Sequence, residues 1–284
     1  MNKPLLSFLE IINLSTEFLR KKGVPSPKCD VEWIISHITQ KGKLELYLDF
    51  GNFLEKEDLN EIRKCVISRG KRIPLQHVIG KVNFAGNDLI CDKRALVPRP
   101  ETEYFTELIR ERIKKNFNGT ILDLGTGSGA IIITLCIENQ KCEGIGVDKS
   151  KSALTLAMEN IKLHELNNVE LKHFDWTKDN LDRTYDVIVS NPPYLSNNEW
   201  LIAQQEVKDY DPKFALVSEK NGISDIFYII KHAEKNLIKD GLFALEIGIG
   251  QKDLITDKIG VAFNNIEIVK DFSQRERFLF AYKN

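Results

Sequence analysis

Residues 120–137 combine a short strand pattern, a glycine-rich turn and an apolar helix pattern. Thr120–Leu124 has the composition of a buried parallel strand, residues 125–129 read Gly-Thr-Gly-Ser-Gly, and residues 130–137 are almost wholly apolar. This order opens a nucleotide-binding βαβ unit, whose glycines let the backbone pass close to a ligand and adopt positive φ. It constrains the fold more than any other feature, because it requires a parallel sheet covered by helices.

The residues around the turn indicate which ligand it accepts. The third glycine comes one residue too early for Gly-x-Gly-x-x-Gly, and no Lys-Ser/Thr pair follows as in a phosphate loop. Asp123 precedes the glycines, where it would repel a pyrophosphate but favour an ammonium group. This position also fits a residue that only bonds the glycine turn. The next strand pattern ends in Asp148, at the position where an acidic side chain accepts hydrogen bonds from ribose hydroxyls. The expected ligand thus has a ribose and a positive charge but no phosphate, and these features point to S-adenosylmethionine.

A second motif, Asn191-Pro192-Pro193-Tyr194, follows the apolar strand pattern Tyr185–Ser190. Two consecutive prolines force the backbone to leave the sheet, and they offer carbonyl oxygens without N–H donors. The Asn191 side chain adds an acceptor oxygen and Tyr194 adds a flat ring. Such a corner can hold a planar –NH2 group, with two acceptors for its hydrogens and an aromatic face beside it. Read alone, the tetrapeptide also fits a rigid turn after a strand.

From residue 99 onward, strand and helix patterns alternate, which predicts a mostly parallel sheet. A third strand begins at Val169, a fourth spans Tyr185–Ser190, and a fifth spans Gly241–Ile247. The last two strand patterns, Ile266–Val269 and Arg277–Tyr282, are separated by a short polar turn. We therefore expect this last pair to be antiparallel.

The first part of the chain has a different pattern. Residues 1–70 show apolar stripes at helical spacing, interrupted by Gly23, by Ser26-Pro27 and by Gly70. Residues 71–98 contain Gly80, Gly86 and two short β-like pieces, which predict a linker with a hairpin. We thus expect a helical domain over 1–70, a linker over 71–98 and a ligand-binding domain over 99–284. The basic run Arg69–Arg72 is interpreted as a solvated face.

Composition excludes several classes of protein. The net charge of −1 gives no general attraction for nucleic acid, so no stable nucleic-acid binding is expected. No apolar run approaches the roughly 18 residues of a membrane span. Five cysteines without a Cys-x-x-Cys pair fit reduced thiols, and together with the absence of a signal-peptide pattern they predict a cytoplasmic protein. The five histidines lack ligand spacing, so no metal is predicted.

Several stretches together resemble the protein-(glutamine-N5) methyltransferases of peptide chain release factors, the PrmC/HemK family. The resemblance runs from about residue 60 to the C-terminus. It rests on Arg69-Gly70 through Pro74, Gln76, Gly80, Leu96–Glu103, Leu122–Gly129, Asp148, Asp175-Trp176, Ser190–Tyr194 and Leu245–Gly248 with Gln251. The run Pro98-Arg99-Pro100-Glu101-Thr102-Glu103 discriminates best from other methyltransferases that contain Asn-Pro-Pro-Tyr. His77 and the segment Asp271–Arg277 depart from the family pattern.

The resemblance implies a fold, a reaction and a site. The fold is a Rossmann-like class I methyltransferase domain with a seven-stranded, mostly parallel sheet, after a small helical domain and a β-hairpin. The reaction transfers a methyl group from S-adenosylmethionine to the glutamine amide nitrogen in the Gly-Gly-Gln motif of release factors, the proteins that act in translation termination. The helical domain would hold the factor, and residues 98–103 are a candidate lid over the cofactor. The predicted catalytic residues are Asn191, Pro192 and Tyr194, and with Pro193 they form the predicted substrate site. The predicted cofactor site comprises Asp123, Gly125, Thr126, Gly127, Ser128, Gly129, Asp148, Asp175, Trp176 and Asn191.

Two other functions fit parts of the pattern. A methyltransferase of an exocyclic amine of adenine or guanine could use the same Asn-Pro-Pro-Tyr corner on a flipped base, but it would need a basic groove that the sequence does not show. A non-catalytic module that senses S-adenosylmethionine would not need Asn191 and Tyr194. Trp176 stacks on adenine in the family-based interpretation, whereas read alone it fits a core residue.

Overall fold

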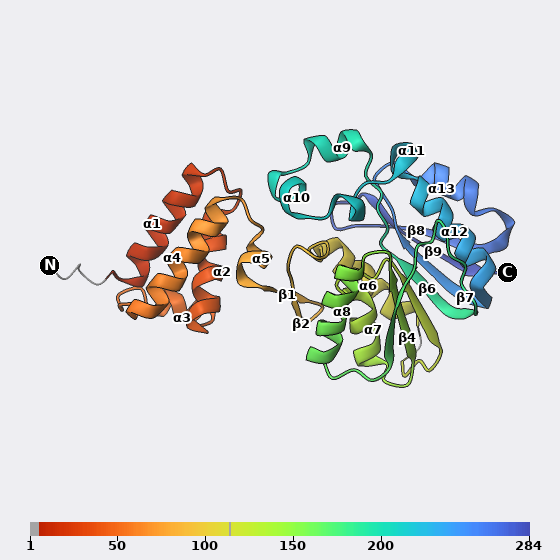
Figure 1. The fold of residues 1–284 in the computed structure, drawn as a ribbon, viewed down its shortest axis with the longest axis horizontal. Coiled ribbons are helices and arrows are strands. Elements are labelled where there is room, and N and C mark those ends of the chain that lie inside the picture. Colours follow the sequence, from red (N-terminus) through yellow and green to blue (C-terminus); the bar gives the residue numbers. More distant parts are fainter. Residues whose placement is uncertain (1–5, 114) are drawn as a thin grey trace. The chain divides into compact units, whose positions relative to one another are not determined.

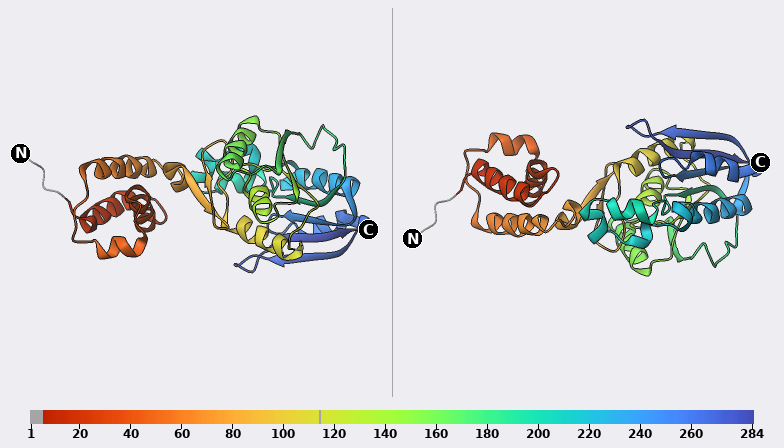
Figure 2. Two further views of the ribbon diagram at one scale, coloured as in Figure 1. Left: turned by 90° about the horizontal axis from the view of Figure 1, so that it is seen from below. Right: turned by 90° about the horizontal axis from the view of Figure 1, so that it is seen from above.

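The computed structural model describes residues 6–113 and 115–284 of the chain. They form two compact units. One comprises the residues up to Gly80 together with Gln205–Tyr210, and the other comprises Lys81–Gln204 and Asp211–Asn284. Figures 1 and 2 show the first unit as a cluster of helices and the second as a sheet with helices against it. The sequence predicts domains over 1–70, 71–98 and 99–284. The separate function assigned to each of them stays a prediction.

The first unit is helical, as predicted. Its helices are α1 (Phe8–Lys21), α2 (Pro27–Thr39), α3 (Lys43–Leu48), α4 (Lys56–Gly70), α5 (Leu75–Ile79) and α10 (Gln205–Tyr210). Ser7 and Glu10 form a capping box at the start of α1, and Pro27 occupies the first turn of α2. The predicted apolar stripes meet in one core, in which Ile12, Ile34 and Ile62 are fully buried or nearly so.

The expectation of a solvated basic face at Arg69–Arg72 is wrong for Arg69. Its guanidinium is buried and donates to Asp30 at 2.7 Å and to Glu206 of α10 at 2.9 Å. Arg72 also donates to Glu206, at 2.7 Å. The carboxylates that neutralise Arg69 lie 39 and 137 residues away in the chain, so the local charge pattern could not indicate its burial.

The predicted hairpin opens the second unit. Strands β1 (Lys81–Phe84) and β2 (Asn87–Ile90) pair antiparallel. The buried side chain of Asn160 accepts from the Ile90 N–H at 2.7 Å and donates to the Ser128 carbonyl at 2.9 Å. One amide therefore ties the hairpin to the glycine-rich turn.

The second unit contains the predicted seven-stranded sheet, in the order β5-β4-β3-β6-β7-β9-β8. In chain order its strands are β3 (Thr120–Leu124), β4 (Glu143–Asp148), β5 (Val169–His173), β6 (Tyr185–Ser190), β7 (Leu237–Glu246), β8 (Phe263–Lys270) and β9 (Glu276–Lys283). The strands from β5 to β7 are parallel, and β9 pairs antiparallel with both neighbours. The fold prediction is thus confirmed, including the antiparallel last pair.

Helices cover both faces of this sheet (Figures 1 and 2). Side chains of α6 (Pro100–Arg112), α7 (Ala130–Glu138) and α8 (Lys151–Leu163) share a core with Ile121 of β3, and those of α12 (Ser224–Asn236) and α13 (Lys252–Ile259) share another with Leu122. Successive strand residues point to opposite faces, which is why neighbours enter different cores. Shorter elements connect these helices: α9 (Asn197–Ile202), η1 (Lys213–Ala215), α11 (Glu219–Gly222) and η2 (Gly260–Ala262).

None of the helices in the described residues combines the length and apolar character needed to cross a bilayer. These residues also contain no group of three or more side chains arranged to hold a metal ion.

Candidate active site

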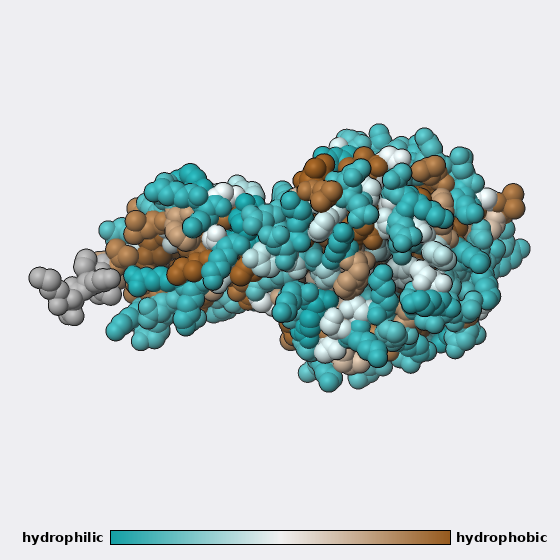
Figure 3. Space-filling view, turned by 45° about the horizontal axis from the view of Figure 1, so that its top comes forward, coloured by the Kyte–Doolittle hydropathy of each residue, from teal (hydrophilic) through white to brown (hydrophobic). Residues whose placement is uncertain are grey.

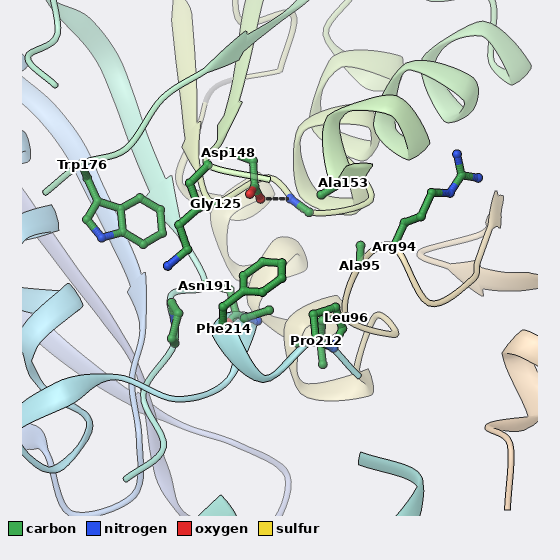
Figure 4. Close-up of a pocket in the computed structure, with 14 residues that line it drawn as sticks. Arg94, Ala95, Leu96, Gly125, Asp148, Ala153, Trp176, Asn191, Pro212 and Phe214 are labelled. Carbon is green, nitrogen blue, oxygen red and sulfur yellow. Dashed lines mark hydrogen bonds between the residues drawn. The ribbon is translucent and has the colours of Figure 1, made fainter. Parts of the chain in front are cut away.

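A pocket lies at the carboxyl ends of β3, β4 and β6, where parallel α/β sheets bind ligands. The empty space in it is about 430 Å³, including the part that is open to solvent. Figure 4 shows Asp148, Trp176, Asn191 and Phe214 around the same space. The lining residues are Arg94, Ala95, Leu96, Gly125, Gly127, Asp148, Lys149, Ala153, Trp176, Asn191, Pro193, Pro212, Phe214 and Ala215.

The glycine-rich turn and Asp148 form one side of this pocket. The N–H groups of Gly125 and Thr126 donate to the Val147 carbonyl at 2.8 and 2.9 Å, which bends the turn back over the end of β4. Asp148 accepts from the Gly127 N–H at 3.0 Å, which is the bond drawn in Figure 4, and from the Ser150 N–H at 2.8 Å. Burial raises the pKa of the Asp148 carboxyl, and these two N–H groups oppose that shift.

Asp123 lies beneath the turn with only one of its oxygens bonded. Its Oδ2 accepts from the Thr126 hydroxyl at 2.8 Å, whereas its buried Oδ1 has no hydrogen-bond partner in the described chain. Burial raises the pKa of this carboxyl to about 7. A buried carboxylate oxygen without a partner is costly, so the site favours a cationic donor next to it.

Two aromatic side chains reach the pocket from different segments. Trp176 is buried, its indole N–H donates to Asp225 at 2.7 Å, and it packs in the same core as β3 and β4. Phe214 comes from η1 and is 44% exposed. The Lys149 ammonium lies 5.8 Å from the Trp176 ring centroid and 5.7 Å from that of Phe214. Trp176 therefore belongs to the core and also lines the pocket.

Asn191-Pro192-Pro193-Tyr194 follows directly after β6, as predicted. The Asn191 amide nitrogen donates to the Thr102 hydroxyl at 2.9 Å, while its Oδ1 accepts no hydrogen bond from any described residue. The Pro192 carbonyl also accepts none of the hydrogen bonds found among these residues. Both oxygens that the sequence assigns to a planar –NH2 group are thus available.

The backbone after Tyr194 is held by Gln251 and Gly222. The Gln251 amide donates to the Tyr194 carbonyl at 3.0 Å and to the Gly222 carbonyl at 3.2 Å. Gly222 has φ +86°, and a Cβ placed on it would lie 2.1 Å from the Tyr194 carbonyl oxygen. Only glycine fits there, so this pairing fixes the course of the tetrapeptide.

Several predicted site residues, Asp123 among them, do not line the pocket itself. The Thr126 side chain bonds Asp123, the Ser128 carbonyl bonds Asn160, and Gly129 packs against Ile133 at the start of α7. Asp175 accepts from the Thr177 hydroxyl and N–H groups, which lower its pKa to about 2. Pro192 and Tyr194 adjoin the lining residues Asn191 and Pro193 in the chain. The binding roles of all these residues stay predictions.

The polar groups fit a nucleoside that carries a cationic tail. Asp148 offers a carboxylate at the pocket wall, whereas the buried Asp123, with its unpaired Oδ1, does not line the pocket. The Gly125 backbone comes so close to Trp176 that an added Cβ would lie 3.4 Å from the indole. These features match S-adenosylmethionine better than a pyrophosphate-bearing cofactor, because two acidic groups flank the glycine-rich turn.

Sequence reasoning missed the part of the wall formed by Phe214, Pro212 and residues 94–96. Phe214 comes from the short helix η1 and the others from loops. Leu96 belongs to a stretch that carries the family resemblance, but no local pattern indicates that any of these residues lines a pocket. The Arg94 side chain points away from the pocket (Figure 4) and pairs with Asp92 and Glu159.

Comparisons with known proteins identify the family. A family model described as "Methyltransferase small domain" matches residues 98–209, and one described as "PrmC N-terminal domain" matches residues 10–80. A release factor glutamine methyltransferase from Fusobacterium nucleatum is 36% identical over 97% of this chain and 78% of its own length. The chain belongs to the release factor glutamine methyltransferases. This confirms the resemblance, and with it the prediction of an enzyme that uses S-adenosylmethionine.

Further relatives agree with this assignment. The release factor glutamine methyltransferase of Rhodopirellula baltica is 31% identical over 97% of this chain and 96% of its own length. Among solved structures, a methyltransferase from Pyrococcus furiosus aligns with a TM-score of 0.53 over 70% of this chain and 90% of its own. Its sequence identity is 18%, so this likeness supports the fold alone.

Proposed function

We propose that this protein transfers the methyl group of S-adenosylmethionine to the side-chain amide nitrogen of the glutamine in the Gly-Gly-Gln motif of peptide chain release factors. The observation that carries the proposal is the family match along 97% of the chain, which includes both the helical domain and the tetrapeptide. When bound, S-adenosylmethionine supplies a methyl group activated by its sulfonium. The protein must then orient a weak nucleophile and exclude water.

The two free oxygens of the tetrapeptide explain how an amide is made to react. A glutamine amide nitrogen is a poor nucleophile, because its lone pair is delocalised into the carbonyl. Asn191 Oδ1 and the Pro192 carbonyl would each accept one N–H of that amide, which raises the electron density on its nitrogen. The nitrogen loses a proton readily once it is alkylated, so the site needs no strong base.

The cofactor would lie across the pocket described above. Asp148 would bind the ribose hydroxyls, Asp123 the ammonium group, and Trp176 the adenine. The glycines at 125 and 127 leave the backbone open to the ligand. Each of these assignments is part of the proposal.

The helical unit would hold the release factor. All proposed cofactor residues lie after residue 99, which leaves the first 80 residues for another task. A groove between α1 and α4 is lined mainly by apolar side chains, of which Leu14 and Ile67 are more than half exposed. Figure 3 shows hydrophobic surface over the N-terminal helices. We place the reaction in the cytoplasm, where the five free cysteines would stay reduced.

The test is a methyl-transfer assay with the full chain and labelled S-adenosylmethionine. Its acceptors are a bacterial release factor, the same factor with its motif glutamine replaced by alanine, and total RNA or DNA. We expect label only in the first factor, on that glutamine. Label in nucleic acid and none in the factor would support the alternative base methyltransferase instead.

A further inference from the structure

A hydrogen-bonded network starts at Asn191 and returns to Tyr194. The Asn191 amide nitrogen donates to the Thr102 hydroxyl at 2.9 Å, and that hydroxyl donates to Glu246 Oε2 at 2.8 Å. The other oxygen of Glu246 accepts from Arg277 at 2.9 Å and from the Tyr194 hydroxyl at 3.2 Å. Arg277 also donates to the Tyr194 hydroxyl at 2.7 Å. We call these five residues the amide network.

The network has a fixed polarity because the Glu246 carboxylate, paired with the Arg277 guanidinium at 2.9 Å, acts as an acceptor. Three donors point at its two oxygens, and its side chain is 1% exposed. Burial raises the pKa of this carboxyl, while the Arg277 guanidinium opposes the shift and favours the ionised form. A threonine hydroxyl has a single proton, and here that proton goes to Glu246. Thr102 can therefore only accept from Asn191.

This polarity determines which end of the Asn191 amide faces outward. The nitrogen and oxygen of an asparagine amide have nearly the same shape, so packing alone does not choose between the two orientations. An acceptor at Thr102 selects the orientation with the nitrogen inward. Oδ1 is then the atom that is left free, as the observed geometry shows.

The contacts of Thr102 differ from those of an ordinary helix hydroxyl. Thr106 lies one turn further along α6, is equally buried, and donates back to the Thr102 carbonyl at 2.8 Å, as helix threonines do. Thr102 instead connects two residues that lie 89 and 144 positions away in the chain. Its hydroxyl thus joins α6 to the ends of β6 and β7.

We propose that Thr102 and Glu246 are positioning residues that hold the Asn191 amide with Oδ1 toward the substrate, and that Arg277 and Glu246 fix the Tyr194 ring beside it. The Arg277 guanidinium also lies 4.6 Å from the centroid of that ring and covers one of its faces. The inference rests on the proposed function, because it assigns Asn191 to the substrate amide. It also gives the Pro98–Glu103 segment a role other than a lid.

The test compares Thr102→Val, Thr102→Ser and Thr106→Val in the full chain. Valine keeps the shape of threonine but removes the hydroxyl, so the Asn191 amide loses its fixed orientation. We expect kcat for release-factor methylation to fall about tenfold to a hundredfold, as for other misplaced groups, with S-adenosylmethionine affinity within about twofold of wild type. Thr102→Ser should restore most of the activity. Thr106→Val controls for the loss of a buried hydroxyl and should stay near wild type.

A double-mutant cycle separates positioning from a general structural effect. In an Asn191→Ala background, Thr102→Val should reduce kcat by less than about twofold, because no amide remains to be oriented. A full additional loss in that background would overturn the inference, as would wild-type kcat in Thr102→Val alone. Methylation of the release factor by the wild-type enzyme tests the proposed function. The ratios of kcat between the variants test the positioning role of Thr102.

A second readout does not require turnover. The side-chain amide signals of Asn191 in a ¹⁵N-labelled sample are identified by their loss in Asn191→Ala. We expect Thr102→Val to shift them and to speed their hydrogen exchange, while Thr106→Val leaves them in place. Unchanged signals in Thr102→Val would overturn the inference even if the acceptor were a different molecule.

Discussion

At the scale of single residues, the proposed contact of Asp123 with the ammonium group would link cofactor binding to pH. Burial raises the pKa of this carboxyl from 3.8 to about 7, so the folded protein binds its proton more tightly than the unfolded chain. The contribution of Asp123 to folding stability therefore falls as pH rises from about 4 to about 7. A bound ammonium group would favour the ionised form and reverse this preference.

We expect S-adenosylmethionine to bind about tenfold more weakly at about pH 6 than at about pH 7.5, where Asp123 is largely ionised. Calorimetric titration across this range measures the effect. Asp123→Asn is the control, and it should bind weakly with little dependence on pH. The same pH dependence in Asp123→Asn would assign the titration to another group.

The contact between Asn191 and Thr102 changes what is expected of substitutions at Asn191. From the sequence alone, Asn191→Asp should keep more activity than Asn191→Ala, because it keeps an acceptor oxygen. In the structure, an aspartate would place a second carboxylate against a hydroxyl whose proton already serves Glu246. We therefore expect both variants to lose about 10²–10³ in kcat. Substantial activity in Asn191→Asp, measured by release-factor methylation, would show that the amide N–H is dispensable.

The sequence predicted the site residues that themselves belong to local motifs. Gly125, Gly127, Asp148, Trp176 and Asn191 all line the pocket, since each lies at or near the end of a recognisable strand. Thr102 and Glu246 were part of the family resemblance but had no assigned contact. Their hydrogen bond joins residues 144 positions apart, and only the folded sheet brings these residues together.

At the scale of elements, the course of the tetrapeptide depends on the short helix α11. Gly222 ends α11 with φ +86° and lies against the Tyr194 carbonyl. Gly222→Ala would add both backbone strain and a clash, so we expect Tyr194 to move and kcat to fall at least tenfold. Gly86→Ala is the matched control, because Gly86 has φ +83° but nothing within 4 Å of an added Cβ. Equal kcat in the two variants would mean that the contact with Tyr194 is unimportant.

The regular elements were predictable from periodicity, whereas their ends and the short helices were not. Strand β5 ends at His173, two residues before Asp175, and β7 begins at Leu237 rather than at Gly241. Its pairing with β6 has a register shift between Tyr185 and Val187, which no sequence pattern indicates. Helices α9, α10 and α11 each have six residues or fewer, too few for a helical period to be recognised.

At the scale of the whole molecule, the chain crosses between its two units more often than a linear division predicts. Helix α10 lies between the tetrapeptide and α12 in sequence, yet it belongs to the helical unit. Glu206 holds it there: burial raises the pKa of Glu206, but hydrogen bonds from Arg72 and Arg69 outweigh this effect and leave the pKa lowered. A domain boundary drawn from composition misses a segment such as α10 that rejoins the first unit, because its six residues are too few to show a sequence pattern.

A substitution at Arg69 tests how much its buried ion pairs with Asp30 and Glu206 contribute to the stability of the helical unit. We call these three residues the Arg69 cluster. Arg69→Met would leave Asp30 buried without its cation, and Glu206 would keep only Arg72. Removing one partner of a buried ion pair typically costs about 3–5 kcal/mol, so we expect the helical unit to unfold at clearly lower denaturant concentration. The affinity for S-adenosylmethionine should change little, since the residues proposed to bind it lie in the other unit.

Arg63→Met on the same helix is the control. It removes an exposed cation and should shift stability by less than about 0.5 kcal/mol. If the two variants unfolded alike, the Arg69 cluster would be replaceable by apolar packing, and the attachment of α10 would depend on its other contacts, such as the hydrogen bond from Tyr210 to the Lys71 carbonyl.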